Sequence, residues 1–386
     1  MLKQTLIRIT TVPLSLEKLL SGQLHFMSSF YNVIAVSSDK ERLERYGESE
    51  KVAVFPLEMT RKITPLHDVF AVLKLYFFLK KTKPFIVHTH TPKAGIVGML
   101  ASKLAGIPHR LHTVAGMPLL EQVGFKRMVL NFVEKLTYSC ATKVYPNSFK
   151  LRDVIIKNEY CPPTKLKVLA NGSSNGIDTS YFDTSNFSDG YKNNLKRELG
   201  IESSDFVFIF VGRIVSNKGI NELINAFSKI QESKKDIKLL LVGPYEKELD
   251  PLKAETLNQI KNIKSIISVG YQPDVRPYFA ISDTLIFPSY REGFPNVVMQ
   301  AGAMGLPSIV TDINGCNEII IEGKNGAIIP VKDSEAVYNA MKKMMEDDTL
   351  RTHLKYNARL MIIDNYERQV VWEAILAEYK RLEENV

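Results

Sequence analysis

The sequence has few of the residues that build disulfide frameworks and metal clusters. Its 386 residues include only 3 cysteines (Cys140, Cys161 and Cys316), and none of them forms a Cys-x-x-Cys pair. This pattern argues against a disulfide scaffold or a zinc site and fits a reducing compartment. The chain also lacks an Asp-x-Asp pair, a carboxylate arrangement suited to holding Mg²⁺ or Mn²⁺. We therefore expect no metal site and no cofactor.

Long apolar runs and the common nucleotide-binding motifs are missing as well. No stretch of about 18 apolar residues occurs, so no membrane-spanning helix is expected. The first 15 residues are interrupted by Lys3 and Arg8 and do not resemble a signal peptide. Neither GxxxxGK[ST] nor GxGxxG occurs, which removes the usual support for an ATPase or a dinucleotide-binding enzyme. A cytoplasmic location is expected.

Positive charge is concentrated in the first half of the chain. Residues 1–180 contain 25 Lys and Arg against 13 Asp and Glu, whereas residues 181–386 contain 25 against 29. A basic half favours an anionic partner such as a membrane surface or a phosphorylated acceptor. Nucleic acid is not expected, because the lysines are scattered and follow no recognisable binding motif.

Short apolar segments alternate with longer amphipathic ones in both halves. Strands are predicted at 5–10, 31–38, 51–57, 85–90, 109–115 and 142–148, and then at 206–213, 238–244, 267–271, 284–289 and 307–312. Helices lie between them, for instance at 66–83, 93–106 and 119–139. Such alternation predicts parallel, doubly wound sheets. We expect an α/β protein with two facing Rossmann-like domains and a ligand cleft between them.

The domain boundary is predicted in residues 169–190, which are rich in Asn, Gly, Ser and Asp. This gives a first domain at 1–180, a second at 181–364 and a final segment at 365–386. The final segment reads as an amphipathic helix with one apolar stripe, formed by Trp372, Ile375, Leu376 and Tyr379.

Two cations follow the first strand of the second half. Arg213 ends that strand and Lys218 lies five residues later, ahead of a helix. A guanidinium, an ammonium group and helix amides at the end of a strand suit a diphosphate. The alternative is a solvated loop with incidental charge.

The stretch "PSYREGFPNVVMQ" (288–300) has the features of a binding turn. Pro295 is expected as the first helical residue, which would leave the amides of Asn296, Val297 and Val298 unpaired. Glu292 precedes this helix, and Gln300 lies one turn after Asn296. Both side chains can accept hydrogen bonds from hydroxyl groups, as a sugar and a ribose require.

Together these segments resemble retaining glycosyltransferases of the GT-B fold, in the large fourth family of that class. The resemblance is strongest to bacterial enzymes of lipid-linked oligosaccharide, capsule and O-antigen assembly. It rests on residues 87–116, the "NGID" before Phe182, "VGRIVSNKG" (211–219), residues 281–307 and "INGCNEII" (313–320).

The resemblance implies a UDP-sugar donor and a final helix that crosses back onto the first domain. It assigns Arg213 and Lys218 to the diphosphate, Glu292 to the donor sugar and position 300 to the ribose. Arg213, Lys218 and Glu292 are thus the expected catalytic residues. The whole expected donor site comprises Gly212, Arg213, Lys218, Gly270, Tyr271, Glu292, Gly293, Phe294, Pro295, Asn296, Val297 and Gln300.

Two residues and one loop depart from the family pattern. Gln300 replaces a second glutamate, which we expect to weaken ribose binding by about 1 kcal/mol without abolishing it. Ala115 stands where many relatives have a histidine that contacts the donor sugar. The first strand-to-helix loop, within residues 10–22, lacks the usual pair of glycines.

Four residues of the first half are candidates for the acceptor side. His88 and His90 are expected on opposite faces of their strand's end, so that one faces the cleft, and His112 is a candidate on the next strand. Lys93, at a helix start, suits an acceptor phosphate. A structural role for each histidine and a surface role for Lys93 are equally open.

The predicted activity is transfer of a hexose or N-acetylhexosamine from a UDP-sugar to a glycan acceptor, with retention of configuration. The resemblance favours a polyprenyl-diphosphate-linked acceptor and an enzyme at the inner face of the cell membrane. The helices at 66–83 and 119–138 are expected to face the core, with peripheral membrane contact favoured by the basic half. A UDP-sugar epimerase on the same fold and a non-catalytic nucleotide-sugar-binding protein remain alternatives.

Overall fold

The computed structural model describes residues 3–60, 62–117, 119, 122–246 and 250–384. The chain forms two compact units. Unit 1 comprises Met1–Asn175 and Gln369–Val386, and unit 2 comprises Gly176–Arg368. The sequence placed these divisions at residues 180/181 and 364/365.

Each unit contains a six-stranded parallel sheet. Unit 1 has the order β3-β2-β1-β4-β5-β6, formed by Thr5–Ile9 (β1), Asn32–Ser37 (β2), Ala53–Pro56 (β3), Ile86–His90 (β4), His109–Val114 (β5) and Lys143–Pro146 (β6). Unit 2 has the order β12-β11-β10-β7-β8-β9, formed by Phe206–Val211 (β7), Ile237–Val242 (β8), Ile266–Gly270 (β9), Thr284–Phe287 (β10), Ser308–Thr311 (β11) and Gly326–Ile329 (β12). Both sheets therefore have the strand order of a Rossmann fold.

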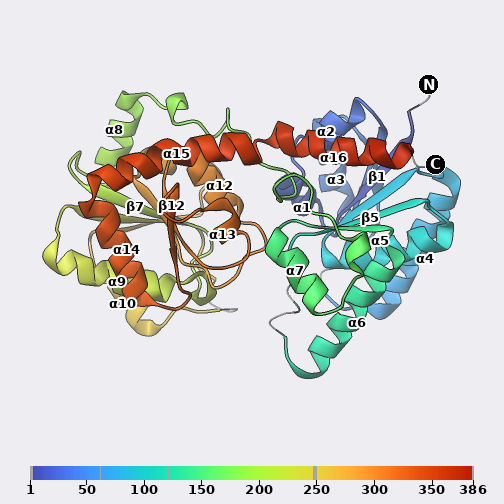
Figure 1. The fold of residues 1–386 in the computed structure, drawn as a ribbon, viewed down its shortest axis with the longest axis horizontal. Helices are drawn as coiled ribbons and strands as arrows, with labels where there is room; N and C mark the ends of the chain where they lie inside the picture. The colour runs from blue at the N-terminus through green and yellow to red at the C-terminus, as the bar shows by residue number, and fades with distance from the viewer. Residues whose placement is uncertain (1–2, 61, 118, 120–121, 247–249, 385–386) are drawn as a thin grey trace. The chain divides into compact units, whose positions relative to one another are not determined.

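Helices connect the strands and cover both faces of each sheet (Figure 1). Those of unit 1 are Pro13–Leu19 (α1), Gln23–Ser28 (α2), Lys40–Glu50 (α3), Pro65–Thr82 (α4), Pro92–Ala105 (α5), Gly124–Cys140 (α6) and Phe149–Lys157 (α7). Those of unit 2 are Asp189–Glu198 (α8), Ile220–Ser233 (α9), Ala254–Asn262 (α10), Arg276–Ala280 (α11), Asn296–Ala303 (α12), Cys316–Ile319 (α13), Ser334–Glu346 (α14) and Asp348–Tyr366 (α15). The last helix is Arg368–Glu383 (α16).

The central strands are buried because they are apolar on both faces. β10 has four buried residues in succession, and β7 is buried from Val207 to Phe210. Parallel strands covered by helices on both sides require this continuous apolar pattern. The two-domain α/β prediction is confirmed.

The carboxyl-terminal helix α16 packs on the sheet of unit 1. Trp372, Ile375, Leu376 and Tyr379 are all buried, as the predicted stripe requires. They share an apolar cluster with residues of α2 and α3, beside which α16 lies in Figure 1. The helix begins at Arg368, because the chain breaks its helical path at Glu367 after α15.

Two elements differ from the sequence prediction. Strand β12, with the short sequence GAII, was not predicted because four residues that begin with glycine resemble a loop. Helix α6 begins at Gly124 instead of residue 119. Residues 118, 120 and 121, just before this helix, lie outside the described part of the chain. No helix of the described residues is long and apolar enough to cross a membrane.

Candidate active site

The candidate site lies at the topological switch point of the sheet in unit 2. There β7 and β10 are neighbours, and the chain leaves them toward opposite edges of the sheet. Ligands of open α/β sheets bind beyond the carboxyl ends of the strands at such a point. The loop after β7 contains Arg213 and Lys218, and the loop after β10 contains Glu292.

Lys218 is held in a short 3₁₀ turn, Ser216–Lys218, between β7 and α9. Asp250 fixes this turn, because its carboxylate accepts from the Asn217 amide at 2.6 Å. The side chain of Asn221 donates to Ser216 Oγ at 2.9 Å and so ties the turn to the start of α9. The turn is therefore a rigid support for the Lys218 side chain.

Gly219 brings this turn against the end of β10. Its φ of +72° is in the left-handed region, and a Cβ there would lie 2.1 Å from the carbonyl oxygen of Pro288. Only glycine fits both the conformation and the contact. The close approach joins the two loops, since the Tyr290 amide also donates to Asn217 O at 2.9 Å.

The joined loops place the Lys218 ammonium directly on the Glu292 carboxylate. The two side chains are only 16% and 17% exposed, and the ammonium lies 5.5 Å from the centroid of the Phe287 ring. An ammonium group has three donors, so this ion pair leaves Lys218 able to bind further oxygens. The sequence predicted both residues for the donor site, and the structure brings them into contact.

Arg213 lies on the same loop as Lys218, and its side chain is more exposed than that of Lys218. Its Nη1 donates to Glu246 Oε2 at 2.7 Å, and the side chain is 45% exposed. A guanidinium carries five donors in a planar fork, so one contact with a carboxylate uses only part of its capacity. The side chain is placed where an anion can approach from solvent.

The backbone around Glu292 is supported from a neighbouring loop. Asn314 Nδ2 donates to Gly293 O at 2.5 Å and to Glu292 O at 3.3 Å. Gly315 has a φ of +76°, and a Cβ there would lie 2.6 Å from Gly293 O. The "NGC" segment after β11 therefore packs on the Gly-Phe-Pro turn and fixes its path.

The start of α12 corrects one detail of the prediction. The helix begins at Asn296, and Pro295 is its N-cap instead of its first helical residue. The Val298 amide was predicted to be unpaired. It donates to Pro295 O at 3.1 Å and is therefore not available to a ligand. The amides of Asn296 and Val297 remain the candidates for binding an anion at this helix end.

The other predicted donor residues also lie in unit 2. Gly212 follows β7, and Gly270 ends β9 with the exposed Tyr271 after it. Phe294 packs its ring 5.5 Å from that of Tyr366. Gln300 is partly buried in α12, one turn after Asn296.

His88 and His90 do not point to opposite faces of β4, which corrects the prediction. Residues two apart on a strand share a face, and the two rings stack at 4.4 Å. Each is 1% exposed. His88 pairs with Tyr379 Oη at 2.6 Å, and His90 Nε2 lies 2.8 Å from Arg8 Nη2.

Burial lowers the pKa of both histidines well below the ordinary value, and the positive charge of Arg8 acts in the same direction. The hollow that they line has a volume of about 10 Å³, enough for roughly one water molecule. Both rings thus belong to a buried polar network in unit 1, and neither is open to a sugar.

Lys93 and His112 are also less exposed than surface residues. Lys93 is 11% exposed and forms an ion pair with Asp68 of α4. His112 accepts or donates at Nδ1 to Thr89 Oγ1, 2.8 Å away, and burial lowers its pKa to about 4. His112 lines a hollow of about 220 Å³ at the carboxyl ends of β4 and β5, together with Thr91, Thr113, Ala115 and Gly116.

Glu134 of α6 lines the same hollow and was not singled out from the sequence. It is 8% exposed, and burial raises the pKa of its carboxyl group. The sequence gives no sign of this burial, because a single glutamate in an amphipathic helix is expected on its exposed face. Asp250 and Asn221 were missed because each acts by holding a loop and follows no motif, and Asn314 was given no role although it lies in the quoted segment 313–320.

The two Rossmann-like units, each with a six-stranded parallel sheet, are those of GT-B glycosyltransferases. Residues 26–172 match the model of a glycosyl transferase 4-like domain, and residues 192–361 match that of glycosyl transferases group 1. The chain belongs to this glycosyltransferase family.

Two relatives illustrate the membership, and one solved structure illustrates the fold. The chain is 32% identical over 381 residues to the capsular polysaccharide biosynthesis glycosyltransferase CapM of Staphylococcus aureus, covering 98% of this chain and 97% of the relative. It is 29% identical to an Escherichia coli enzyme named UDP-Gal:alpha-D-GlcNAc-diphosphoundecaprenol alpha-1,3-galactosyltransferase, covering 87% and 85%. The crystal structure of Anabaena Alr3699/HepE in complex with UDP and glucose has a TM-score of 0.80 at 18% identity, covering 98% of this chain and 100% of that one.

Proposed function

We propose that the protein transfers a hexose or N-acetylhexosamine from a UDP-sugar to a glycan acceptor, with retention of the anomeric configuration. The acceptor is a polyprenyl-diphosphate-linked sugar, and the reaction serves the assembly of a surface polysaccharide. The observation that carries this proposal is the contact of Lys218 with Glu292 at the switch point of unit 2, with Arg213 on the same loop.

The three side chains suit the two parts of a nucleotide sugar. Lys218 and Arg213 both retain donors for phosphate oxygens after their present contacts. The Asn296 and Val297 amides at the start of α12 add further donors. Glu292 accepts hydrogen bonds from sugar hydroxyl groups, and its contact with Lys218 fixes the sugar next to the diphosphate.

In the proposed reaction the acceptor hydroxyl oxygen forms a bond to the anomeric carbon of the donor sugar. The bond from that carbon to the diphosphate breaks, and UDP departs with the electron pair. The hydroxyl proton moves to the departing phosphate oxygen on the same face. Arg213, Lys218 and the helix amides stabilise the negative charge that develops there. In this proposal they do so without a metal ion.

The relatives support the donor and acceptor of this proposal. The name of the Escherichia coli relative specifies UDP-Gal as donor and a diphosphoundecaprenol-linked acceptor, and the Staphylococcus aureus relative is named for capsular polysaccharide biosynthesis. An acceptor of this kind is anchored in a lipid bilayer. The enzyme would therefore work at the inner face of the cell membrane, where the basic first half of the chain suits the anionic surface.

The test is a screen of UDP-sugars with and without a polyprenyl-diphosphate-linked acceptor, in which free UDP is measured. Transfer predicts that UDP release needs both substrates and continues in excess EDTA. Lys218→Gln should lower the rate by about two orders of magnitude or more, because the departing diphosphate loses a charge. Lys229→Gln is the matched control, since Lys229 of α9 also forms an ion pair, but an exposed one with Glu335 of α14.

Other outcomes of this screen identify the alternatives. Conversion of the donor sugar without an acceptor would indicate an epimerase. Binding of UDP with no release from any UDP-sugar would indicate a non-catalytic binding protein. Loss of activity in EDTA that Mg²⁺ restores would contradict the metal-independent mechanism.

A further inference from the structure

Helix α4 of unit 1 is apolar on its outer face as well as on its inner face. Leu66, Val69, Phe70, Leu73 and Phe77 are each between 46% and 77% exposed. Successive helical residues are about 100° apart, so these five positions form one stripe along the helix. The opposite side packs into the core through Ala71, Val72, Leu75 and Leu79. Apolar stripes on two opposite sides of a helix require a cover on both sides.

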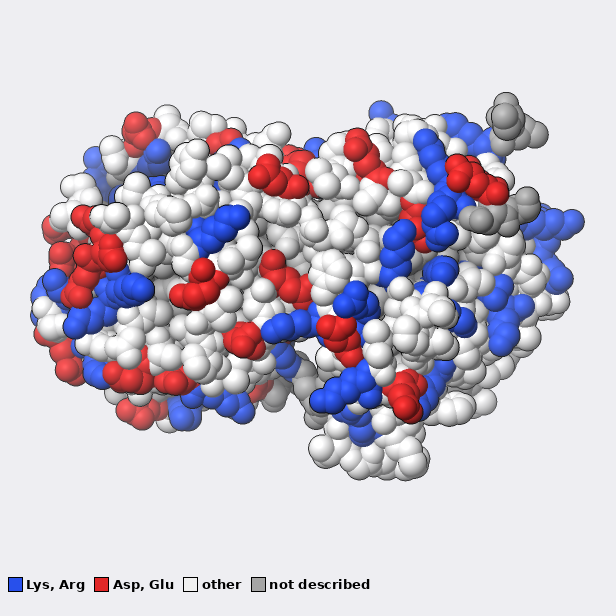
Figure 2. All heavy atoms as spheres, in the orientation of Figure 1, with Lys and Arg blue, Asp and Glu red and all other residues white. Residues whose placement is uncertain are grey.

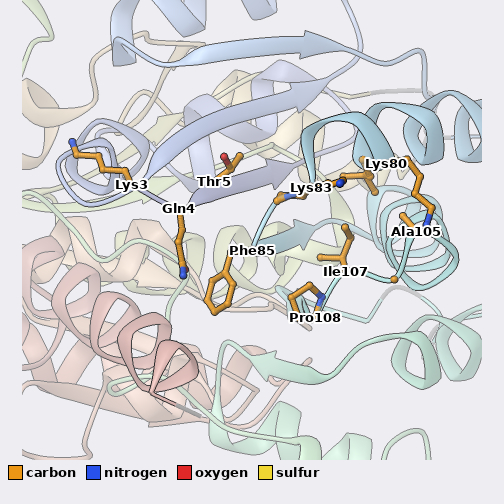
Figure 3. A pocket seen from close by; sticks show the side chains of 12 residues that line it. Lys3, Gln4, Thr5, Lys80, Lys83, Phe85, Ala105, Ile107 and Pro108 are labelled. Atoms are coloured by element: carbon orange, nitrogen blue, oxygen red, sulfur yellow. The ribbon is translucent and has the colours of Figure 1, made fainter. Parts of the chain in front are cut away.

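The exposed stripe of α4 continues into a basic region. Lys80 and Lys81 follow at the same helical positions, and Lys83 comes just after the helix. Lys80, Lys83 and Lys3 surround a surface hollow of about 590 Å³ (Figure 3). Residues 62–83 contain five lysines and one acidic residue, Asp68, which is already paired with Lys93.

Helix α6 carries a second exposed stripe of the same kind. Phe125, Met128 and Phe132 are 60–76% exposed, and Val123 just before the helix is 85% exposed. Lys126 and Lys135 lie beside this stripe and are exposed. The outer end of α6 is a mostly uncharged bulge in Figure 2. Both helices pack against α5 on one face of the sheet.

We infer that the outer faces of α4 and α6 dock the enzyme on an anionic lipid bilayer. Apolar side chains enter the interface and the flanking lysines bind lipid phosphates, as in other helices that lie in the membrane plane. The inference rests on the proposed function and deepens it by naming the surface that would hold the enzyme near a lipid-linked acceptor. In a parallel α/β unit the helices begin at the carboxyl edge of the sheet, so the exposed start of α6 lies at the edge where a lipid-linked acceptor would bind.

A second copy of the chain fits this surface less well than a bilayer. Symmetric pairing would bring each patch against itself, which would put the lysines of both copies, Lys74, Lys80 and Lys81, into one interface. Like charges at an interface oppose association. An anionic surface has the complementary charge for the same residues.

The experiment is vesicle flotation of the full chain with no sugar substrate present. Phosphatidylcholine vesicles are compared with vesicles that also contain phosphatidylglycerol, and binding should need the anionic lipid. Phe70→Ser with Phe77→Ser should weaken binding by about tenfold or more, because two apolar side chains no longer enter the interface. Lys80→Gln with Lys81→Gln should weaken it by about fivefold for each lysine, and high salt should have the same effect.

Tyr356→Ser is the matched control, because Tyr356 is an aromatic residue of unit 2 that is 72% exposed, as Phe70 is. Its binding should equal that of the unaltered chain, and all variants should keep the same melting temperature. Binding that the phenylalanine and lysine variants leave unchanged would overturn the inference. So would a dimer in vesicle-free solution that Phe70→Ser with Phe77→Ser converts to a monomer, since that would identify a second copy as the occupant.

A soluble acceptor analogue separates this inference from the proposed function. The phenylalanine variant should transfer sugar to such an analogue at the normal rate and lose activity only toward acceptor in vesicles. If the unaltered chain transfers no sugar to either acceptor, the proposed function fails, whereas the vesicle-binding result still decides the docking surface.

Discussion

Lys218 and Glu292 make one close contact in unit 2, although they would serve different parts of a nucleotide sugar. In the proposed donor complex the ammonium would face the diphosphate and the carboxylate would face the sugar hydroxyls. Their contact keeps both side chains in place before the ligand arrives, which lowers the ordering cost of binding. Replacing either residue should therefore affect the binding of both parts of the donor.

Glu134 gives a residue-scale prediction about stability. Burial raises the pKa of its carboxyl group in the folded protein. The folded state therefore holds this proton to a higher pH than the unfolded chain, and the stability that it confers is lost as pH rises above the ordinary glutamate value. Glu134→Gln cannot ionise. The variant should melt at the same temperature as the unaltered chain near pH 4 and at a higher temperature near pH 8.

Thermal melting across this pH range checks the prediction. Glu50→Gln is the control, because Glu50 is also 8% exposed but accepts from the amides of Gly22 and His25 at 2.7 and 3.0 Å. Its variant should melt lower at pH 8, since one of these acceptors is lost. A Glu134→Gln variant that melts lower than the unaltered chain at pH 8 would show that the carboxylate has a stabilising partner.

At the scale of elements, α16 is fixed to unit 1 by a polar contact inside an apolar cluster. The Tyr379 hydroxyl accepts from Arg8 Nη1 at 3.0 Å and pairs with His88 Nδ1 at 2.6 Å. Arg8 is fully buried and has no acidic partner in the described part of the chain; its other contacts are Gln23 and His90. The last helix thus supplies a hydrogen bond that the first strand needs.

Tyr379→Phe should destabilise unit 1 by about 3 kcal/mol, because it leaves a buried guanidinium donor and an imidazole nitrogen without a partner. Trp372, the one tryptophan of the chain, lies on α16 and reports its release in urea unfolding followed by fluorescence. Tyr356→Phe, on an exposed residue, should change stability by less than about 0.5 kcal/mol. Equal urea midpoints of unfolding for Tyr379→Phe and Tyr356→Phe would show that the Tyr379 hydroxyl does not stabilise unit 1.

The elements could be predicted and the main candidate site residues singled out from local patterns, whereas the partners of these residues could not. Apolar strands and amphipathic helices repeat over a few residues, so the alternation of β and α was visible in the sequence. Strand β12 was too short to give such a pattern. The burial of His88 and His90 could not be decided from the sequence, because it depends on α16, a segment almost 300 positions away in the chain.

The loop supports of the donor site were hidden for the same reason. Gly219 and Pro288 are 69 positions apart, yet the backbone of one excludes a side chain on the other. Arg213, Lys218 and Glu292 were singled out as candidates because cations and carboxylates at strand ends suggest chemistry by themselves. Asp250 and Asn314, which position those loops through backbone contacts, have no such signature.

At the scale of the whole molecule, the two units share one strand order but differ in charge and in the residues at their switch points. Unit 2 carries cations beside the junction of β7 and β10, while the junction of β1 and β4 in unit 1 holds the buried network of Arg8 and His90. The donor site is thus expected within unit 2 alone.

Hydrogen exchange of the full chain tests this expectation. UDP should slow exchange in the loops at 212–219 and 290–297 and leave the amides of β4 unchanged, because bound phosphates take up donors of those loops and stabilise them. UMP is the control, and it should protect 212–219 less because it lacks the second phosphate. Protection by UDP that is confined to unit 1 would show that the donor site has been placed on the wrong unit.

Gly219 and Gly315 have a consequence for comparing this chain with other members of the family. Each glycine lies where a single added carbon atom would collide with the backbone of the facing loop. A homologue that keeps the arginine, lysine and glutamate but replaces either glycine loses the geometry that joins them. The two glycines are therefore a sharper genomic marker of a working donor site than the charged residues, and decayed copies of the gene should first be sought by substitutions at these two positions.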